Sequence, residues 1–281
     1  MATIEELESL RWDLRCDCVD IIMAGAGGHI GGDMSVIDAL MTLYANHLNI
    51  SPETVDDPNR DRFVLSKGHA MEAYYAVLCH EGYLDLDDVK ARFSKFGSPY
   101  IGHPNNKLKG IEMNSGSLGH GLPVAVGMAL AGKMDGRDYR VYTIMGDGEL
   151  AEGSVWEGAM SGGNYQLDNL CALVDRNRLQ IDGSTETVMS SEPLEEKMKA
   201  FNFNVLTING HDYDQIEAAI QAFHAENDKP TCIIMDTTKG KGVSFMTNSV
   251  DWHGKGPNDD EYKIAIEELN AAYAALEQEE N

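Results

Sequence analysis

The stretch that decides the fold is Val141–Gly183, which reads VYTIMGDGELAEGSVWEGAMSGGNYQLDNLCALVDRNRLQIDG. Its first five residues form an apolar run of the length of a buried strand, which stops at a Gly-Asp-Gly turn. A helix-like segment follows, and a second apolar run, Leu170–Val174, ends at Asp-Arg-Asn. Two strand ends are therefore expected to deliver the Asp147 carboxylate, the Gly148 backbone and the Asn177 carboxamide. These groups suit a hard cation and a phosphate.

The rest of the chain repeats this alternation of short apolar runs and helical patterns. Further strands are expected at 61–66, 203–208 and 231–236. Helices are expected over 7–23, 34–48, 70–81, 85–93, 124–134, 213–226 and 260–280, with loops at 96–111 and 243–255. Thr3 and Glu6 form a capping-box pattern before the first helix, and Asp33 or Ser35 is expected to cap the second. This order predicts an α/β fold in which residues 1–281 form one domain, a mostly parallel sheet with helices on both faces.

Composition and charge exclude several classes of protein. The formal net charge of −24 makes nucleic acid an improbable partner, and its simplest interpretation is a solvated acidic surface. The sequence has no apolar run long enough for a membrane span and no signal-peptide pattern at its N-terminus. Its five cysteines are odd in number, and Cys79, Cys171 and Cys232 lie in apolar contexts. We therefore expect a reduced, cytoplasmic protein with buried thiols.

Glycine-rich segments with histidine or lysine recur at the expected strand ends and helix starts. They are Ala24–Gly32, which contains His29, then Lys67-Gly68-His69, Asn114–Pro123 and Lys239–Gly242. Each lets the backbone approach a ligand closely, and backbone N–H groups at a helix start can meet an anion. Taken singly, the first segment is more simply interpreted as a flexible loop and the second as a surface turn.

The Gly-Asp-Gly turn and the asparagine suggest a site for Mg²⁺ or Ca²⁺. Both ions prefer oxygen ligands, and Mg²⁺ often shares them with substrate phosphates. Asp147 would supply a carboxylate oxygen, Asn177 a carboxamide oxygen, and Leu179 a backbone carbonyl. Gly148 would let a helix start approach the phosphate, because it has no Cβ atom in the way.

The spacing of these residues leads to a known family. Gly146-Asp147-Gly148, 28 intervening residues and Asn177 match the thiamine-diphosphate fingerprint. Further segments resemble transketolase, in transketolase order. These are Gly28-His29-x-Gly31, Leu65–Ala70, Gly102-His103-Pro104, Gly116–Gly121, Lys239–Gly242 and Trp252-His253-Gly254. The resemblance covers nearly the whole chain and implies the diphosphate-binding type of thiamine-diphosphate domain.

The resemblance also implies how the cofactor would be held. Asp147, Asn177 and the Leu179 carbonyl are similar to the metal ligands of the family. The cofactor itself would contact a wider set, with the phosphate end near two histidines and the aminopyrimidine near a glycine-rich segment. That set is His69, Lys67, Gly116, Leu118, Gly148, Glu149, Asn177, Lys239 and His253, among which Lys67 and Lys239 resemble pocket lysines of animal-type transketolases.

Other residues resemble those that act on the sugar. His29 and His103 are similar to the histidines that hold the hydroxyl groups of the donor, and His253 would share that role. Glu152 and Glu157 resemble glutamates that face the partner active site across the dimer, and we take Glu152 as catalytic. Carboxylates near a helix start also interact favourably with the helix dipole, so this position alone does not prove such a role.

Some histidines carry no such implication. His120 stands where many relatives have glutamine, which leaves its role open. The remaining ones are interpreted as solvated side chains: His47, His80, His211 and His224.

The length of the chain suggests what is missing. A full transketolase is more than twice as long, and its second domain supplies the glutamate that bonds the aminopyrimidine. We therefore expect a split transketolase, in which this chain is the diphosphate-binding subunit and a second chain carries the pyrimidine-binding domain, as an α2β2 heterotetramer. The reaction implied is ketol transfer from a ketose, phosphorylated or related, to an aldose acceptor, and the isolated chain would be inactive. Two alternatives remain: the α-subunit of a 2-oxo-acid dehydrogenase E1, and a non-catalytic subunit.

Overall fold

The computed structural model describes residues 1–25 and 27–279 and contains a five-stranded sheet in the order β1-β2-β3-β7-β6. All neighbouring strands of this sheet are parallel. The strands are β1 (Arg62–Leu65), β2 (Val141–Gly146), β3 (Leu170–Arg176), β6 (Asn204–Asn209) and β7 (Thr231–Asp236). The predicted α/β fold with a mostly parallel sheet is confirmed.

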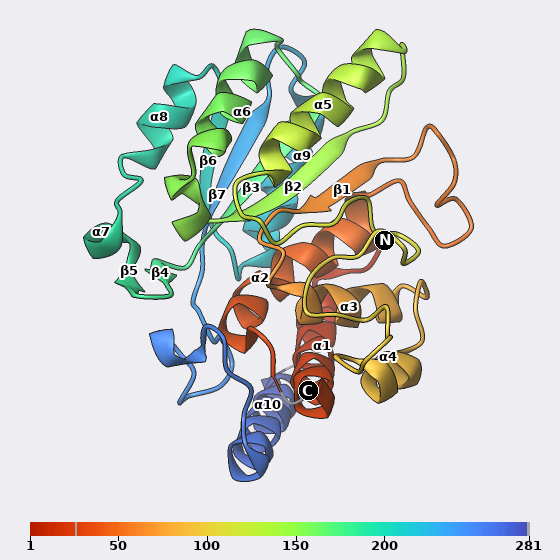
Figure 1. The fold of residues 1–281 in the computed structure, drawn as a ribbon, viewed down its shortest axis with the longest axis vertical. Helices are drawn as coiled ribbons and strands as arrows, with labels where there is room; N and C mark the ends of the chain where they lie inside the picture. Colours follow the sequence, from red (N-terminus) through yellow and green to blue (C-terminus); the bar gives the residue numbers. More distant parts are fainter. Residues whose placement is uncertain (26, 280–281) are drawn as a thin grey trace.

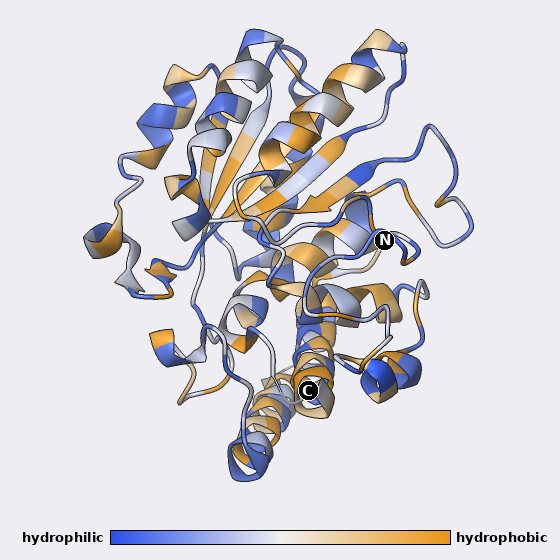
Figure 2. Cartoon of the chain, in the orientation of Figure 1, coloured by the Kyte–Doolittle hydropathy of each residue, from blue (hydrophilic) through white to orange (hydrophobic). Residues whose placement is uncertain are grey.

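Helices cover both faces of this sheet (Figure 1). One face carries α5 (Gly121–Met134), α6 (Gly153–Asn164) and α8 (Leu194–Ala200). The other carries α1 (Ile4–Gly25), α2 (Ile30–Thr42), α3 (Met71–His80) and α9 (Tyr213–Ala225), with α4 (Leu86–Arg92) beside α1 and α3 and α10 (Asp259–Glu279) packed against α1. Because both faces are covered, the three central strands β2, β3 and β7 are mostly apolar (Figure 2), whereas the edge strand β6 is partly exposed.

Successive side chains of each strand enter different cores. Tyr142 and Ile144 of β2 pack among α1, α2 and α3, whereas Val141 and Met145 pack beneath α5 and α6. This separation follows from the two-residue period of a strand.

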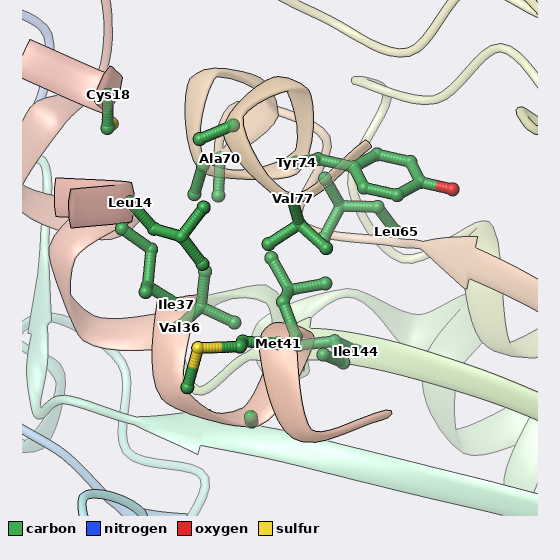
Figure 3. Close-up of a cluster of buried hydrophobic side chains, with 14 of the residues drawn as sticks. Leu14, Cys18, Val36, Ile37, Met41, Leu65, Ala70, Tyr74, Val77 and Ile144 are labelled. Carbon is green, nitrogen blue, oxygen red and sulfur yellow. The ribbon is translucent and has the colours of Figure 1, made fainter. Parts of the chain in front are cut away.

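The core around α2 and α3 positions the ends of these helices. Figure 3 shows Val36, Ile37 and Met41 of α2 packed with Tyr74 and Val77 of α3 and with residues of α1, β1 and β2. Helices packed in this way cannot shift along the sheet without opening the core, where packing is close to crystal density. The starts of α2 and α3 are therefore held beside the carboxyl ends of the strands.

The second helix differs from its prediction. It begins at Ile30 rather than Met34, so Gly31 and Gly32 are helical, and its N-cap is His29. The flexible-loop interpretation is wrong for this part of the glycine-rich segment, while Ala26 lies outside the described residues. The predicted cap at Asp33 or Ser35 is also wrong, because both residues lie inside the helix. A π-helical turn, Leu43–His47, completes the segment.

Other local predictions have mixed outcomes. The capping box is confirmed, since the Thr3 N–H donates to Glu6 Oε2 (2.7 Å) and the Glu6 N–H donates to Thr3 Oγ1 (3.1 Å). The predicted loop at 243–255 contains a short 3₁₀ helix, Val250–Trp252. No element was predicted between 178 and 202, where the chain forms β4 (Leu179–Gln180), β5 (Gly183–Ser184), α7 (Thr185–Val188) and α8.

Two predictions concern the chain as a whole. In the described ranges, no helix is both long enough and apolar enough to cross a membrane. All five cysteines are free thiols, and Cys18, Cys171 and Cys232 are buried.

Candidate active site

The carboxyl ends of four parallel strands meet around one cavity of about 150 Å³. Lys67 follows β1, Asp147 follows β2, Asn177 follows β3 and Lys239 follows β7. The predicted site residues that line this cavity are Lys67, His69, Leu118, Asp147, Gly148, Glu149, Asn177, Leu179, Lys239 and His253. The structure thus brings together residues from Lys67 to His253 that are far apart in the sequence.

Asp147 and Asn177 place a carboxylate and a carboxamide at one end of the cavity. Asp147 Oδ2 accepts a hydrogen bond from the Arg178 N–H (2.7 Å), and Asn177 Oδ1 accepts one from the Leu179 N–H (3.1 Å). Burial, and then the neighbouring Asp175, raise the pKa of Asp147 to about 6. A bound cation would offset this cost by stabilising the carboxylate. The predicted ligand oxygens therefore fit a divalent cation, although no group of three His, Cys, Asp or Glu side chains suited to a metal occurs among the described residues.

Gly148 lies where a side chain would not fit. A Cβ atom on this residue would lie 2.9 Å from Cβ of Gln180, closer than real Cβ contacts. The 3₁₀ helix Gly148–Ala151 begins here. Gly148 lines the cavity, and its predicted approach to a phosphate group stays a prediction.

Lys67 is paired with a residue that the sequence analysis did not select. Its ammonium forms a buried ion pair with Asp175 and also donates to the Gly32 carbonyl (2.9 Å). The Asp175 carboxylate accepts a further bond from Ser35 Oγ (2.6 Å), and Asn177 Nδ2 donates to it at 3.3 Å. Lys67 therefore joins α2 to β3 and orients Asn177, in addition to lining the cavity. The apolar strand before Asp175 was the only signal for its burial.

Lys239 is the second lysine of the cavity, and it is nearly fully buried. Its Nζ atom lies 2.8 Å from Nδ1 of His253. Burial, and then the charge of Lys67, lower the pKa of Lys239 to about 8. Because Lys67 is paired with Asp175, Lys239 supplies the local positive charge of the cavity in a chain whose net charge is −24.

Four of the predicted histidines converge at this site. The ring centroid of His29 lies 5.4 Å from that of His69, 5.7 Å from that of His103 and 5.8 Å from that of His253. Burial is the main cause that lowers the pKa of all four, to about 4 for His29 and His253. These imidazoles are therefore neutral at pH 7, each with one donor and one acceptor nitrogen for a polyhydroxylated ligand.

Gly116 lies against one of these histidines but does not line the cavity. Its φ angle is 135°, and a Cβ atom there would lie 2.6 Å from Cδ2 of His103. The predicted contact segment is thus joined to the histidine cluster through a position that requires glycine.

Glu149 has a role within the protein. Its buried carboxylate accepts hydrogen bonds from Ser66 Oγ, from the Gly119 N–H (2.8 Å) and from the Gly146 N–H (3.1 Å). These contacts tie the glycine-rich segment before α5 to the ends of β1 and β2. The predicted contact of Glu149 with the cofactor stays a prediction.

Glu152 and Glu157 lie away from the cavity. Both are exposed near the start of α6, and Glu157 lines a separate surface groove with His120. Such exposure is compatible with contact to a partner chain, but the predicted role of Glu152 and Glu157 stays a prediction.

Three histidines interpreted as solvated are in fact bonded within the protein. His211 Nδ1 lies 2.6 Å from Asp38 Oδ2, and its Nε2 accepts from the Thr238 N–H at 2.9 Å. His47 Nε2 lies 2.8 Å from a Glu217 oxygen. His224 Nε2 lies 2.7 Å from the Tyr142 hydroxyl. The prediction was wrong because all these partners are distant in the sequence, and it is confirmed only for His80, which is exposed.

Comparison with known proteins agrees with this geometry. Residues 9–275 match the family described as transketolase, thiamine diphosphate binding domain. The chain is 44% identical to one of the subunits of apulose-4-phosphate transketolase from Phocaeicola vulgatus, over 99% of both chains. It is 41% identical to the 6-deoxy-6-sulfo-D-fructose transketolase subunit SqwG of a Clostridium species, over 86% of this chain and 88% of that protein. Among solved structures, transketolase from Campylobacter jejuni superimposes with a TM-score of 0.89 at 31% identity, over 98% of this chain and 46% of that one.

The fold and the strand-end site define a thiamine-diphosphate-binding domain, and the chain belongs to the transketolase family. Within this family it is one subunit of the split type, because it matches such subunits along almost their whole length. The resemblance inferred from the sequence motifs is therefore confirmed, and the transketolase assignment is favoured over the E1 alternative.

Proposed function

We propose that this chain and a separate subunit together transfer a two-carbon ketol unit from a ketose to an aldose acceptor. The observation that supports this best is the convergence of four neutral histidines beside the cavity that contains Asp147 and Asn177. A site for a 2-oxo acid would not need several imidazoles to bind hydroxyl groups. The names of the related subunits refer to apulose 4-phosphate and to a sulfofructose, so a phosphorylated or sulfonated ketose is the proposed donor class.

Thiamine diphosphate would supply the carbanion and the electron sink of such a reaction. Asp147, Asn177 and the Leu179 carbonyl would hold Mg²⁺ or Ca²⁺, and Gly148 would face the diphosphate. Lys239 would add positive charge at that end.

The histidines would act on the sugar. Neutral imidazoles can bind hydroxyl groups both as donors and as acceptors, and they can also move a proton at a hydroxyl oxygen. In this proposal His29 and His103 orient the donor, while His69 and His253 lie nearer the diphosphate. All four rings are half-buried, which leaves part of each accessible to a ligand.

A second chain completes the site in this proposal. Because the chain spans only 46% of the full-length transketolase it superimposes on, the partner would provide the pyrimidine-binding domain. We propose an α2β2 assembly in the cytoplasm, in which residues 1–281 form one domain and Glu152 and Glu157 face the partner.

The test is a reconstitution of the two-subunit complex with thiamine diphosphate and Mg²⁺. The complex should transfer the ketol unit of hydroxypyruvate to an aldose, and the chain alone should not. Decarboxylation of pyruvate in place of hydroxypyruvate would contradict the proposal. Absence of cofactor binding by the complex, measured by calorimetry, would instead indicate a non-catalytic subunit.

A further inference from the structure

Two buried carboxyl groups lie directly behind the histidine cluster. Asp33 belongs to the first turn of α2 and Glu72 to the first turn of α3, and both side chains are fully buried. Asp33 Oδ1 accepts a hydrogen bond from the Ala73 N–H (3.0 Å). Within the described residues, Asp33 Oδ2 and both Glu72 oxygens have no hydrogen-bond donor. Such groups are costly to bury, so their presence requires an explanation.

Because Ala73 directly follows Glu72, this hydrogen bond holds the Asp33 carboxyl beside the first turn of α3, to which Glu72 belongs. Two ionised carboxylates have only acceptor oxygens and repel each other, whereas one proton between them provides the missing donor. Neither Glu72 oxygen accepts a hydrogen bond from a backbone N–H of the described residues. A shared proton therefore joins two of the three oxygens that lack a hydrogen-bond donor.

The surroundings support a single negative charge on this pair. From α1 the pair meets the Cys18 thiol, whose pKa is raised well above its usual value by burial and then by the two acids. Lys67 and Lys239 approach from the ends of β1 and β7, but Lys67 is already paired with Asp175. Tyr75 is a further titratable group on α3. Burial raises the pKa of both acids, that of Glu72 well above its usual range, so the pair holds its proton at neutral pH.

The pair also contacts two of the loops that carry the histidines. A Cβ atom on Gly28 would lie 2.7 Å from Glu72 Oε1, and one on Gly102 would lie 3.6 Å from the same oxygen. These glycines directly precede His29 and His103. Asp33 is connected to the first loop as well, because its N–H donates to the His29 carbonyl (3.2 Å). Any separation of the two carboxyl groups would thus displace both histidines.

We propose that Asp33 and Glu72 are positioning residues that share one proton and thereby hold His29 and His103 in place to orient the sugar donor. The sugar-binding part of this proposal rests on the proposed function, whereas the shared proton does not. When the pH rises and the pair loses this proton, two adjacent carboxylates repel each other and the loops move apart. Binding of the ketose donor should then weaken at alkaline pH.

The first experiment detects the proton directly. Carboxyl ¹³C NMR of the full chain should show a buried acid that remains protonated at pH 6, well above the ordinary range of about 4. This signal should be lost in both Glu72→Gln and Asp33→Asn, and kept in Glu81→Gln, a control at the other end of α3. Asp147 should also titrate near pH 6, so the variants decide: if Glu72→Gln and Asp33→Asn both keep every carboxyl signal that titrates above pH 5.5, roughly one unit beyond ordinary carboxyls, the shared proton is refuted.

The second experiment measures positioning in the two-subunit complex. In Glu72→Gln the side-chain amide still donates a hydrogen bond to Asp33. The KM of this variant for the ketose should therefore stay within about twofold of wild type, and it should not rise between pH 7 and 9. Glu72→Ala removes the contact, so its KM should rise about tenfold, while the Kd for thiamine diphosphate with Mg²⁺ changes less than about threefold. The positioning role is overturned if the KM for the ketose is unchanged in Glu72→Ala. It is also overturned if this KM rises at alkaline pH in Glu72→Gln as much as in wild type. Should the complex lack ketol transfer altogether, the proposed function fails, and the NMR titration still decides the shared proton.

Discussion

The Lys239 ammonium lies 2.8 Å from Nδ1 of His253, and the described residues provide no carboxylate that forms a salt bridge with it. A buried cation that has only a neutral imidazole as its partner is a ready binding group for an anion. Its position beside Asp147 and Gly148 in the same cavity places it at the proposed diphosphate end.

The first prediction follows from the charge of Lys239. Its pKa of about 8 means that the ammonium is present below pH 8 and is lost as the pH rises through that value. The affinity of the complex for thiamine diphosphate should therefore fall by up to about tenfold between pH 7 and 9. A Lys239→Arg variant, which stays charged, should lose this pH dependence, and Lys239→Gln should bind weakly throughout. Calorimetry at three pH values is the measurement, and an equal decline in Lys239→Arg would argue against this origin.

The second prediction concerns the metal site. Asp147→Asn removes the only carboxylate from the predicted ligand set while keeping the shape of the side chain. We expect it to weaken Mg²⁺-dependent binding of thiamine diphosphate by about 3 kcal/mol, or roughly a hundredfold. The control is Asp87→Asn, whose side chain is 95% exposed on α4. Wild-type affinity in Asp147→Asn would exclude this residue as a ligand.

The third prediction concerns the buried pair of Lys67 and Asp175. Asp175→Ala leaves the Lys67 ammonium buried without its counter-charge, so unfolding in urea should show a loss of about 3–5 kcal/mol. Lys67→Met leaves the Asp175 carboxylate buried without its counter-charge and should be similarly destabilising. The double variant should lose much less than the sum of both single losses, because it leaves no unpaired charge. Additive losses would mean that the two groups do not interact.

The fourth prediction tests the contact between Gly116 and His103. Gly116→Ala introduces a Cβ atom at a φ angle of 135° and pushes it against the imidazole. The expected cost is about 1–3 kcal/mol of stability, together with a higher donor KM in the complex. Gly127→Ala is the matched control, since a Cβ atom in this part of α5 meets nothing within 4 Å and alanine favours a helix. Thermal unfolding of both variants and of wild type provides the comparison.

Local sequence patterns predicted much of the architecture. Apolar runs identified β2, β3, β6 and β7 within one or two residues, and the runs of β2, β3 and β7 reflect burial on both faces of the sheet. In the region 178–202, the seven-residue helix α8 was missed, and β4, β5 and α7 were missed as well because they are only two to four residues long. Elements of this size have too few residues for a hydrophobic period to be recognised.

The sequence alone determined the type of domain and where its ligand groups lie. A Gly-Asp-Gly turn after one strand and an asparagine after the next must meet at one edge, because parallel strands all end on the same side of a sheet. Only the tertiary structure decided which side chains pair. Lys67 with Asp175, Asp33 with Glu72, and His211 with Asp38 are separated by 39 to 173 residues along the chain. No local pattern encodes such pairs, because hydrophobic periodicity reports which face of an element is buried and not which neighbour it meets. Packing of α2 and α3 against the sheet brings these charged groups together in an interior of low dielectric, where pairing and proton sharing follow.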